Sequence, residues 1–461
     1  IHDVTYQSIL KRDRRRFHAA VGDAISEIHA GQIEEFAPTL ARHYEEAGDS
    51  GKALRHLLIA GESAQTRHAM PESHAFYTRA ATIVEDDPDA SYVERIGVML
   101  SRAAAGMNFT PGDQTVAQLE QVRAMAEDID DPELLARVYA LLLRVRTMLD
   151  ENYAHPGFRD VMDRAFALTP KLQDSTVRAY LEGMMGEGLR SADEYDRAKQ
   201  LLGGAVGPLE AAGRVGEAGW NAALAADIEA TQGDFDAANE WIERAAALAT
   251  ASGNPNVMAD VELIKGRIAA ARGELETALA HSLAGTEMAE DAGNIQCTLM
   301  GNFMVADQKL RIGDAAAAIP HLEKTFELGE YCNAEAMVAL GHAWLATARA
   351  RMGELDPEAY SDPLQKAQLG GSRGGEAAVR LHRAIAIAGS PDPDWDTSLS
   401  DFRSAISLFQ AIGARPSEAR ATHAYANALE AAGDTESSAI KFAAATRLFD
   451  DLGISPDRAR A

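Results

Sequence analysis

The feature that most constrains the fold is a sequence pattern that recurs every forty residues. Four segments align without gaps: QGDFDAANEWIERAAALATASG (232–253), RGELETALAHSLAGTEMAEDAG (272–293), IGDAAAAIPHLEKTFELGEYCN (312–333) and AGDTESSAIKFAAATRLFDDLG (432–453). Gly353 keeps the register of their first glycines. A period of about 20 to 50 residues indicates an array of repeated structural units instead of one compact core.

Each forty-residue unit predicts two helices joined by a turn. Within 232–253, Phe235, Ala238, Ile242 and Ala245 follow one another at helical spacing and form a single apolar stripe. The recurring glycine readily adopts the left-handed conformation that ends a helix, and the acidic residue after it suits the positive end of the next helix. One pair of helices cannot bury its apolar face alone, so the pairs must stack into a solenoid.

Small residues recur at the same interval and favour close helix packing. They occupy Gly106, Gly186, Ala226, Gly266, Ala306, Ala346, Ala386 and Ala426. We expect that Ala238→Leu or Ala278→Leu would overpack a helix contact, at a cost of roughly 1 to 3 kcal/mol. By the same reasoning Asp227→Ala, expected on a polar face, should change stability by no more than about half a kcal/mol.

The pattern resembles the tetratricopeptide repeat (TPR). The residues that match the second helix of that family are Gly233, Asp234, Phe235, Ala238, Ile242 and Ala245. The resemblance implies an all-α, right-handed superhelical solenoid of antiparallel helix pairs, with about nine repeats over residues 88–453. The common TPR unit is about 34 residues long, so a unit of forty implies longer helices or loops.

The first part of the chain resembles the segment that follows the nucleotide-binding module in bacterial STAND-type or AAA-like regulatory ATPases. The matching residues are His2, Val4, Tyr6, Ser8, Leu10, Arg14 to Arg16, Phe17, His18, His43, Tyr44, Glu45, Ala47, Gly48 and Asp49. The resemblance implies four parts: the end of a winged-helix, ATPase-linked segment (1–32), irregular TPR-like helices (33–87), the repeat array (88–453) and a C-terminal tail (454–461).

Such ATPases often carry a class III adenylate or guanylate cyclase domain or a transcriptional output domain. The resemblance therefore implies an upstream ATPase and output domain in the same polypeptide. The missing initiator methionine also favours a longer protein. We expect the basic residues at the start of the chain to contact that upstream module; they are Arg12, Arg14, Arg15 and Arg16.

The charge of the chain argues against nucleic-acid binding along its length. The chain has 44 Lys and Arg against 70 Asp and Glu, a formal net charge of −26 at pH 7. Affinity for nucleic acids comes largely from neutralising phosphates with Lys and Arg. The basic stretch 11–16 is the only candidate, and such a stretch is more often a solvated helix face.

Several short motifs match parts of catalytic or ligand-binding patterns, but the flanking structure or essential residues of those patterns are missing. GGSRG (370–374) satisfies the GxSxG pattern of serine hydrolases, but Ser372 follows a helical segment where the motif requires a strand. Gly370 and Gly375 have phosphate-loop spacing, but Glu376 replaces the essential lysine. The histidines and the two cysteines have no zinc-site spacing. We therefore predict no catalytic, cofactor-binding or metal-binding residue.

The sequence also has neither an apolar run long enough to span a membrane nor a signal-peptide pattern. Only two cysteines are present, which fits a reducing compartment. We expect a cytoplasmic protein without a membrane partner.

The remaining candidate site is the concave surface of the solenoid, where the first helix of each pair should lie. Polar residues follow the column of small residues at forty-residue intervals: Glu187, Asp227, Arg267, Asp307, Thr347 and Asn427. We call these the ladder residues. They could form a groove for a protein or peptide partner, or they could simply be solvated, and the sequence leaves both readings open.

These observations favour a non-catalytic regulatory region of a larger signalling ATPase, which senses a protein or small effector. The alternative is a free-standing TPR scaffold or co-chaperone-like adaptor. An enzyme whose active site lies within the chain would need convergent catalytic side chains, which the sequence does not offer.

Overall fold

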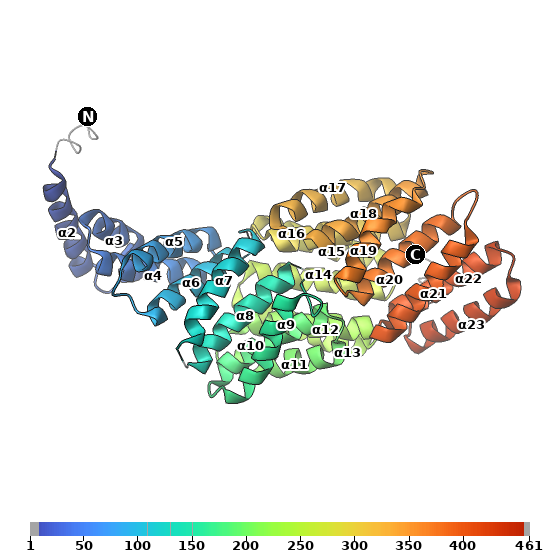
Figure 1. Ribbon diagram of the computed structural model, residues 1–461, viewed down its shortest axis with the longest axis horizontal. Helices are drawn as coiled ribbons and strands as arrows, with labels where there is room; N and C mark the ends of the chain where they lie inside the picture. The colour runs from blue at the N-terminus through green and yellow to red at the C-terminus, as the bar shows by residue number, and fades with distance from the viewer. Residues whose placement is uncertain (1–8, 108, 130, 150, 456–461) are drawn as a thin grey trace. The chain divides into compact units, whose positions relative to one another are not determined.

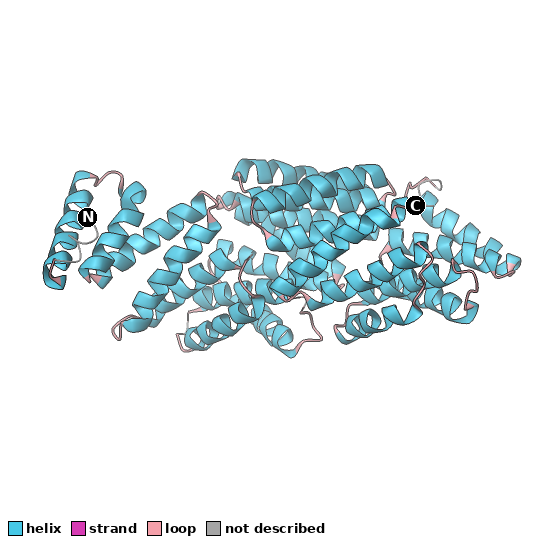
Figure 2. Ribbon diagram, turned by 90° about the horizontal axis from the view of Figure 1, so that it is seen from above, coloured by secondary structure: helices cyan, strands magenta, loops and turns pink. Residues whose placement is uncertain are grey.

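The computed structural model describes residues 9–107, 109–129, 131–149 and 151–455, and these ranges consist of helices and loops without a strand (Figure 1, Figure 2). They divide into two compact units. The first unit comprises Ile1–Thr110 and Gln114–Asp131, and the second comprises Pro111–Asp113 and Pro132–Ala461. The predicted all-α fold class is confirmed.

The helices follow one another along the chain with short connections. Those assigned to the first unit are α2 (Lys11–Ile28), α3 (Ile33–Ala47), α4 (Ser50–Thr66), α5 (Met70–Asp86), α6 (Tyr92–Gly106) and, almost entirely, α7 (Gly112–Glu127). The second unit begins with α8 (Pro132–Met148), α9 (Pro156–Leu168), η1 (Thr169–Lys171), α10 (Ser175–Ser191) and α11 (Tyr195–Ala211). It continues with α12 (Val215–Gln232), α13 (Phe235–Ser252), α14 (Pro255–Ala271), α15 (Leu275–Asp291), α16 (Ile295–Ile312), α17 (Ala315–Cys332), α18 (Glu335–Arg351), η2 (Pro357–Tyr360), α19 (Ser361–Leu369), α20 (Arg373–Ala388), α21 (Trp395–Ile412), α22 (Arg415–Ala431) and α23 (Thr435–Asp451).

The forty-residue glycine pattern closes the helices as predicted. A positive φ angle occurs at Gly213, Gly233, Gly253, Gly273, Gly293, Gly313, Gly353, Gly413, Gly433 and Gly453. Two other residues take the glycine position in the same register, Asp193 with φ 60° and Asn333 with φ 62°. Asp and Asn tolerate this left-handed conformation better than most residues, because their short polar side chains can hydrogen-bond locally.

Consecutive helices pack in pairs, and small residues let the helices approach. A Cβ atom added to Gly266 of α14 would lie 2.5 Å from Ser282 Oγ and 3.1 Å from the carbonyl oxygen of Ala278, both on α15. The side chains of Ala238 and Ala278 are completely buried. The predicted columns of small residues therefore mark real helix contacts.

The second unit also contains contacts between helices that are far apart in sequence. Helix α22 packs against α12 as well as against its neighbours α21 and α23. Nη1 of Arg420 on α22 donates a hydrogen bond to the carbonyl oxygen of Ala271 on α14 at 3.3 Å. The backbone amide of Gly374 at the start of α20 lies 3.2 Å from Asp193 Oδ2. The concave surface between α12 and α22 is thereby enclosed.

The sequence predicted four parts, 1–32, 33–87, 88–453 and 454–461. Helix α2 occupies most of the described part of segment 1–32, and helices α3, α4 and α5 lie within 33–87. The border between the two units falls at residues 110–132, inside the array predicted over 88–453. Residues 1–8, with His2, Val4, Tyr6 and Ser8, and residues 456–461 of the predicted tail lie outside the described residues.

Candidate functional site

Three adjoining cavities lie along the concave surface of the second unit. The main cavity, of about 660 Å³, is lined chiefly by α16, α18, α20, α21 and α22. The middle cavity, of about 290 Å³, shares Asp307, Arg311, Trp344 and Arg420 with it. The third cavity, of about 170 Å³, shares Asp227 and Arg267 with the middle one. The ladder residues all line these cavities.

Asp227 of α12 lies where the middle and third cavities meet. Its side chain accepts a hydrogen bond from Arg190 Nη1 at 3.0 Å, and it forms an ion pair with Arg267 Nε at 2.8 Å. The residue is only 3% exposed. Three successive inner helices, α10, α12 and α14, are therefore joined through one carboxylate.

A second ion pair lies further along the third cavity. The guanidinium group of Arg144 on α8 donates to the carboxylate of Glu187 on α10, and it lies 4.9 Å from the ring centre of Trp220. Glu187 is 4% exposed. This pair links α8 to α10, as Asp227 links α10 to α12.

Asp260 and Cys297 face that ion pair from α14 and α16. Their Oδ1 and Sγ atoms are 2.6 Å apart. Burial raises the pKa of Asp260 to about 7, against its ordinary value of 3.8, and burial together with the nearby Asp260 carboxylate raises the pKa of Cys297 well above 9.0. Cys297 is therefore a protonated thiol at neutral pH, which makes it a poor nucleophile.

The main cavity brings together three arginines that hydrogen-bond to backbone carbonyl groups. Arg311 Nη2 donates to the carbonyl oxygen of Ala270 at 2.9 Å, Arg351 donates to the carbonyl of Leu310, and Arg420 donates to Ala271. These carbonyl groups lie in the last turns of α14 and α16, where helical hydrogen bonding leaves carbonyls without an intrahelical partner.

Asp307 is the carboxylate on this part of the surface. Trp344 Nε1 donates to its Oδ1 at 2.9 Å, and Arg311 Nη1 lies 3.8 Å from its Oδ2. The indole of Trp344 in turn lies beside the ring of His382, with ring centres 3.9 Å apart. Burial lowers the pKa of His382 to about 4. The imidazole is therefore neutral at pH 7 and adds no charge to the cavity.

Thr347 and Asn427 occupy different environments in the same cavity. The hydroxyl of Thr347 donates to the carbonyl oxygen of Ala343 at 2.9 Å and lies 3.0 Å from the hydroxyl of Tyr360. Thr347 is 1% exposed. Asn427 is exposed, and its Nδ2 lies 3.4 Å from Nδ1 of His423.

Three of the six ladder residues do not fit the solvated reading that the sequence left open. Glu187, Asp227 and Thr347 are buried and hydrogen-bonded, so they are not merely solvated. The expectation that Asp227→Ala would be nearly neutral assumed an exposed residue, and that premise is wrong, because Asp227 is buried between two arginines. Whether the ladder residues bind a partner stays a prediction.

Sequence reasoning missed the arginines of the main cavity. Arg311 and Arg351 are forty residues apart and lie one helical turn after Asp307 and Thr347, so a search for charged columns could have found them. Arg420 is likewise forty residues after Arg380, but Arg380 bonds to Asp401, so this spacing does not mark Arg420 as a cavity residue. Arg420 enters the cavity because α22 returns to α12, which is a property of the folded array.

The basic residues predicted to contact an upstream module lie on α2 of the first unit. Arg12, whose side chain is 90% exposed, is 3.9 Å from Asp13, and Arg16 lies 5.7 Å from the ring centre of Phe17. Arg15 lies against Gly48, at the end of α3, and Arg14 is partly buried. The contact with an upstream module stays a prediction.

The motifs that suggested catalysis have structural roles. Ser372 follows helix α19 and caps α20, where its Oγ accepts a hydrogen bond from the amide of Gly375 at 3.0 Å. A nucleophile elbow would need a strand there. Among the residues that the structure describes, no group of three or more His, Cys, Asp or Glu could hold a metal ion. Within the same ranges no helix is both long and apolar enough to cross a membrane.

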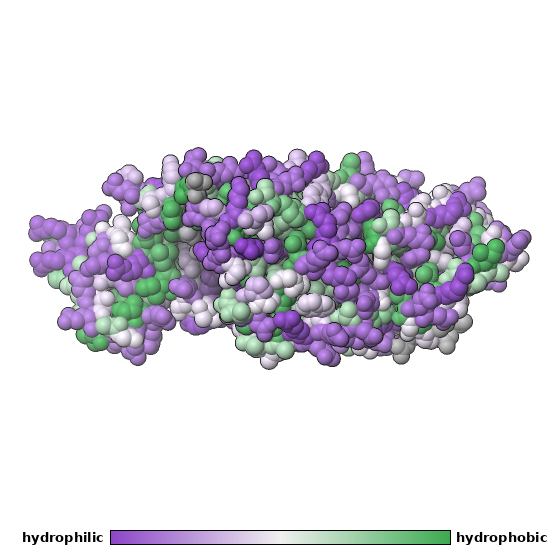
Figure 3. Space-filling view, turned by 90° about the horizontal axis from the view of Figure 1, so that it is seen from below, coloured by the Kyte–Doolittle hydropathy of each residue, from purple (hydrophilic) through white to green (hydrophobic). Residues whose placement is uncertain are grey.

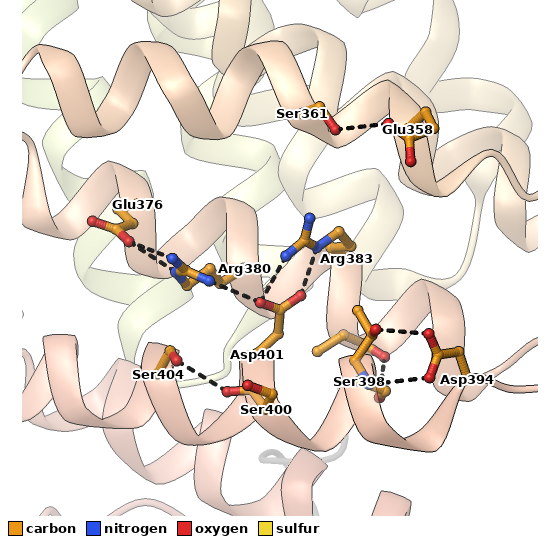
Figure 4. A network of polar contacts seen from close by, with 12 residues as sticks. Glu358, Ser361, Glu376, Arg380, Arg383, Asp394, Ser398, Ser400, Asp401 and Ser404 are labelled. Carbon is orange, nitrogen blue, oxygen red and sulfur yellow. Dashed lines mark hydrogen bonds and ion pairs between the residues drawn. The ribbon is translucent and has the colours of Figure 1, made fainter.

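A further buried charge network lies between α20 and α21 (Figure 4). The Asp401 carboxylate lies between Arg380 and Arg383, with Nη1 of Arg380 at 3.0 Å and Nε of Arg383 at 2.6 Å. Glu376 accepts from the other side of Arg380 at 2.8 Å. Asp401 is 2% exposed, and its partners are supplied by the neighbouring helix. The network therefore holds the two helices of one pair together.

Comparison with known proteins identifies the architecture. No protein-family profile and no curated protein matches the chain. Among solved structures, a Rap protein in complex with the Competence and Sporulation Factor is 16% identical, with a TM-score of 0.59 over 78% of this chain and 99% of that one. This chain folds as a TPR-like solenoid.

Two further solved structures are similar at lower scores. The apo form of the quorum sensor NprR from B. thuringiensis is 12% identical over 78% of this chain and 100% of that one, with a TM-score of 0.48. A STAND protein with a tetratricopeptide repeat sensor from Pyrococcus horikoshii is 12% identical over 90% of this chain and 71% of that one, with a TM-score of 0.46.

Proposed function

We propose that this chain is a regulatory, non-catalytic TPR region that binds an effector in the cavities of its second unit. The main cavity carries the proposal. It is within the size range of about 300 to 1,000 Å³ that is usual for small-molecule and cofactor sites, and it combines apolar walls with a few polar groups. The Rap protein of similar fold was solved with the Competence and Sporulation Factor bound, which agrees with a ligand-binding role.

The chain would act as the sensor of a larger cytoplasmic signalling ATPase. Support for this context comes from the resemblance of the first part of the chain to the segment that follows the ATPase module in STAND-type proteins. The output domain would be a nucleotide cyclase or a transcriptional regulator. The sensor itself would need no cofactor, metal or catalytic residue, and the arginines of α2 would contact the ATPase module.

An effector could act by changing the balance between two arrangements of the solenoid. The lining of the main cavity comes from several helix pairs, so a bound molecule would add contacts that join helices of different pairs. A ligand shifts such an equilibrium only by the difference between its affinities for the two arrangements. We expect the enclosed arrangement, in which Arg420 reaches Ala271, to bind more tightly.

Two measurements test this proposal. The coding sequence upstream of Ile1 should contain a phosphate-loop motif, GxxxxGK[ST]. A start codon directly before Ile1 would instead favour a free-standing scaffold or co-chaperone-like adaptor.

The second measurement is ATP hydrolysis by the full-length protein. Ala378 lines the main cavity, and Ala378→Phe would fill part of it without changing the charge. We expect this variant to change the hydrolysis rate, whereas Arg447→Gln on the exposed surface of α23 should not. Equal rates for the wild type and Ala378→Phe would contradict a sensing role for the cavity.

A further inference from the structure

The charge balance of the main cavity is opposite to that of the whole chain. Arg311, Arg351 and Arg420 line the cavity together with one carboxylate, that of Asp307. These four groups sum to +2, in a chain whose formal net charge is −26. Hydrophilic residues cover much of the molecular face shown in Figure 3. The main cavity therefore concentrates positive charge within an acidic protein.

The way the arginines are held leaves their charge largely uncompensated. Their hydrogen bonds go to the carbonyl oxygens of Ala270, Leu310 and Ala271, which are neutral groups. A guanidinium group has five N–H donors, so a bond to one carbonyl fixes its position and leaves other donors for a ligand. Arg420 also donates to the Ser417 hydroxyl at 3.2 Å, which fixes it further.

Bringing these cations together costs free energy that a bound anion would recover. Burial lowers the pKa of Arg420 to about 9, and the positive charge of Arg311 makes a smaller contribution in the same direction. Burial also lowers the pKa values of Arg311 and Arg351, although the negative charge of Asp307 partly opposes this. Each group still carries its charge at pH 7, so the cavity holds positive charge in a partly dehydrated setting.

The rest of the cavity lining is apolar. Phe402 and Phe409 of α21 contribute aromatic surface, and Leu381 and Ile385 of α20 contribute aliphatic surface. Trp344 lies in the same lining as the arginines and is bonded to Asp307. A ligand that fits this lining has an anionic head and an apolar body.

We propose that the main cavity binds a small organic dianion, whose head is a phosphate monoester or a pair of carboxylates held by Arg311, Arg351 and Arg420. Guanidinium groups bind both kinds of head through paired N–H···O bonds. The two negative charges match the +2 of the cavity, and the apolar body packs against Phe402 and Phe409. This inference rests on the proposed function, because it specifies the ligand class of the same cavity.

The experiment compares four probes that share a phenyl group: phenyl phosphate, phenylsuccinate, phenylacetate and 2-phenylethanol. Binding is measured by titration calorimetry and by tryptophan fluorescence, with Trp344→Phe identifying the signal from the cavity. We expect one of the two dianions to bind at least tenfold more tightly than phenylacetate, and 2-phenylethanol to bind most weakly. The dianion that binds more tightly then identifies the preferred head as a phosphate or a dicarboxylate.

Variants of the arginines test the location. Arg351→Gln and Arg420→Gln should each weaken binding of the preferred dianion at least tenfold, and Arg420→Lys should give an intermediate loss because it keeps the charge without the planar fork. Arg447→Gln is the matched control, since Arg447 also donates to a backbone carbonyl, that of Ala443, but on the exposed surface of α23. Thermal unfolding of each variant verifies that it is folded.

Ala378→Phe gives a test that leaves the arginines in place. It should block the dianion while the fold is retained. The proposal is wrong if neither dianion binds at up to about 10 mM, if the neutral probe binds as tightly as the dianions, or if the arginine variants bind like the wild type. Failure of the sensing role is a separate outcome. It would appear as an unchanged rate of ATP hydrolysis in the full-length Ala378→Phe protein.

Discussion

The substitution Asp227→Ala gives the most direct test of the inner charge network. Asp227 is 3% exposed and receives Arg190 and Arg267 from the two neighbouring inner helices. Alanine removes the carboxylate and leaves both arginines facing a space without their counter-charge. We therefore expect the second unit to lose stability, in contrast to the near-neutral effect that the sequence alone suggested.

The size of the effect follows from the exposure of the two arginines. The side chain of Arg190 is 22% exposed, and a hydrogen bond between charged groups in such a setting contributes about 1.5 to 3 kcal/mol. The side chain of Arg267 is 39% exposed, so solvent screens its ion pair, which contributes about 0.2 to 1 kcal/mol. Together the loss should be about 2 to 4 kcal/mol. Asp227→Asn, which keeps one acceptor oxygen, should lose roughly half of that.

Urea denaturation followed by far-ultraviolet circular dichroism measures the loss, and amide hydrogen exchange on α10, α12 and α14 localises it. Asp291→Ala is the control, because Asp291 is exposed at the end of α15 and its removal should change stability by less than about 0.5 kcal/mol. If Asp227→Ala and Asp291→Ala unfold at the same urea concentration, the network contributes nothing to stability and our reading of it is refuted.

Three further substitutions test other parts of the second unit. Ala278→Leu should lower the free energy of unfolding by about 1 to 3 kcal/mol, because it forces α14 and α15 apart; an unchanged urea midpoint would contradict that contact. Asp401→Ala should lower the free energy of unfolding by about 3 kcal/mol in the same assay, since it leaves two mostly buried arginines of α20 without their carboxylate. A loss below about 0.5 kcal/mol would show that the network in Figure 4 is not stabilising. The pKa of Asp260 is raised in the folded state, so between pH 3.8 and about 7 the folded state holds a proton that the unfolded state has released. The contribution of Asp260 therefore lowers the free energy of unfolding progressively as the pH rises through that range. Asp260→Asn should therefore become more stable relative to the wild type over that range in thermal unfolding, whereas Asp291→Asn should show no such trend; parallel pH profiles would contradict the assignment.

The sequence predicted the local structure because its evidence was periodic. A glycine every forty residues marked helix ends, and its replacement by Asp193 and Asn333 in the same register kept the same positive φ angle. The alanine columns marked helix contacts for a similar reason, since Ala238 and Ala278 are completely buried at the same position of successive repeats. Contacts within a pair and between adjacent pairs repeat along the chain, so a single sequence can reveal them.

Burial along the inner surface could not be predicted in this way. The ladder residues have the polarity of a solvent-exposed groove, but Asp227 and Thr347 are buried groups whose partners come from neighbouring elements. The enclosure of the concave surface by the contact of α22 with α12 is a further property that the repeat pattern does not carry. That enclosure depends on the small rotation from each helix pair to the next. The rotations add up over the pairs between α12 and α22. A small error in predicting each rotation from sequence therefore becomes a large error in the predicted position of Arg420.

The same addition of rotations explains how a small ligand could control a long array. The contact of α22 with α12 constrains the sum of all the rotations between them, and the three cavity arginines come from α16, α18 and α22, which belong to three different pairs. A ligand that joined these arginines would therefore act on the curvature of the whole stretch and not on one pair. A ligand that touched α22 alone would have equal affinity for the enclosed and the open arrangement, and it would shift nothing however tightly it bound. The bridging position of the arginines is thus what would turn binding in one cavity into a change in the array.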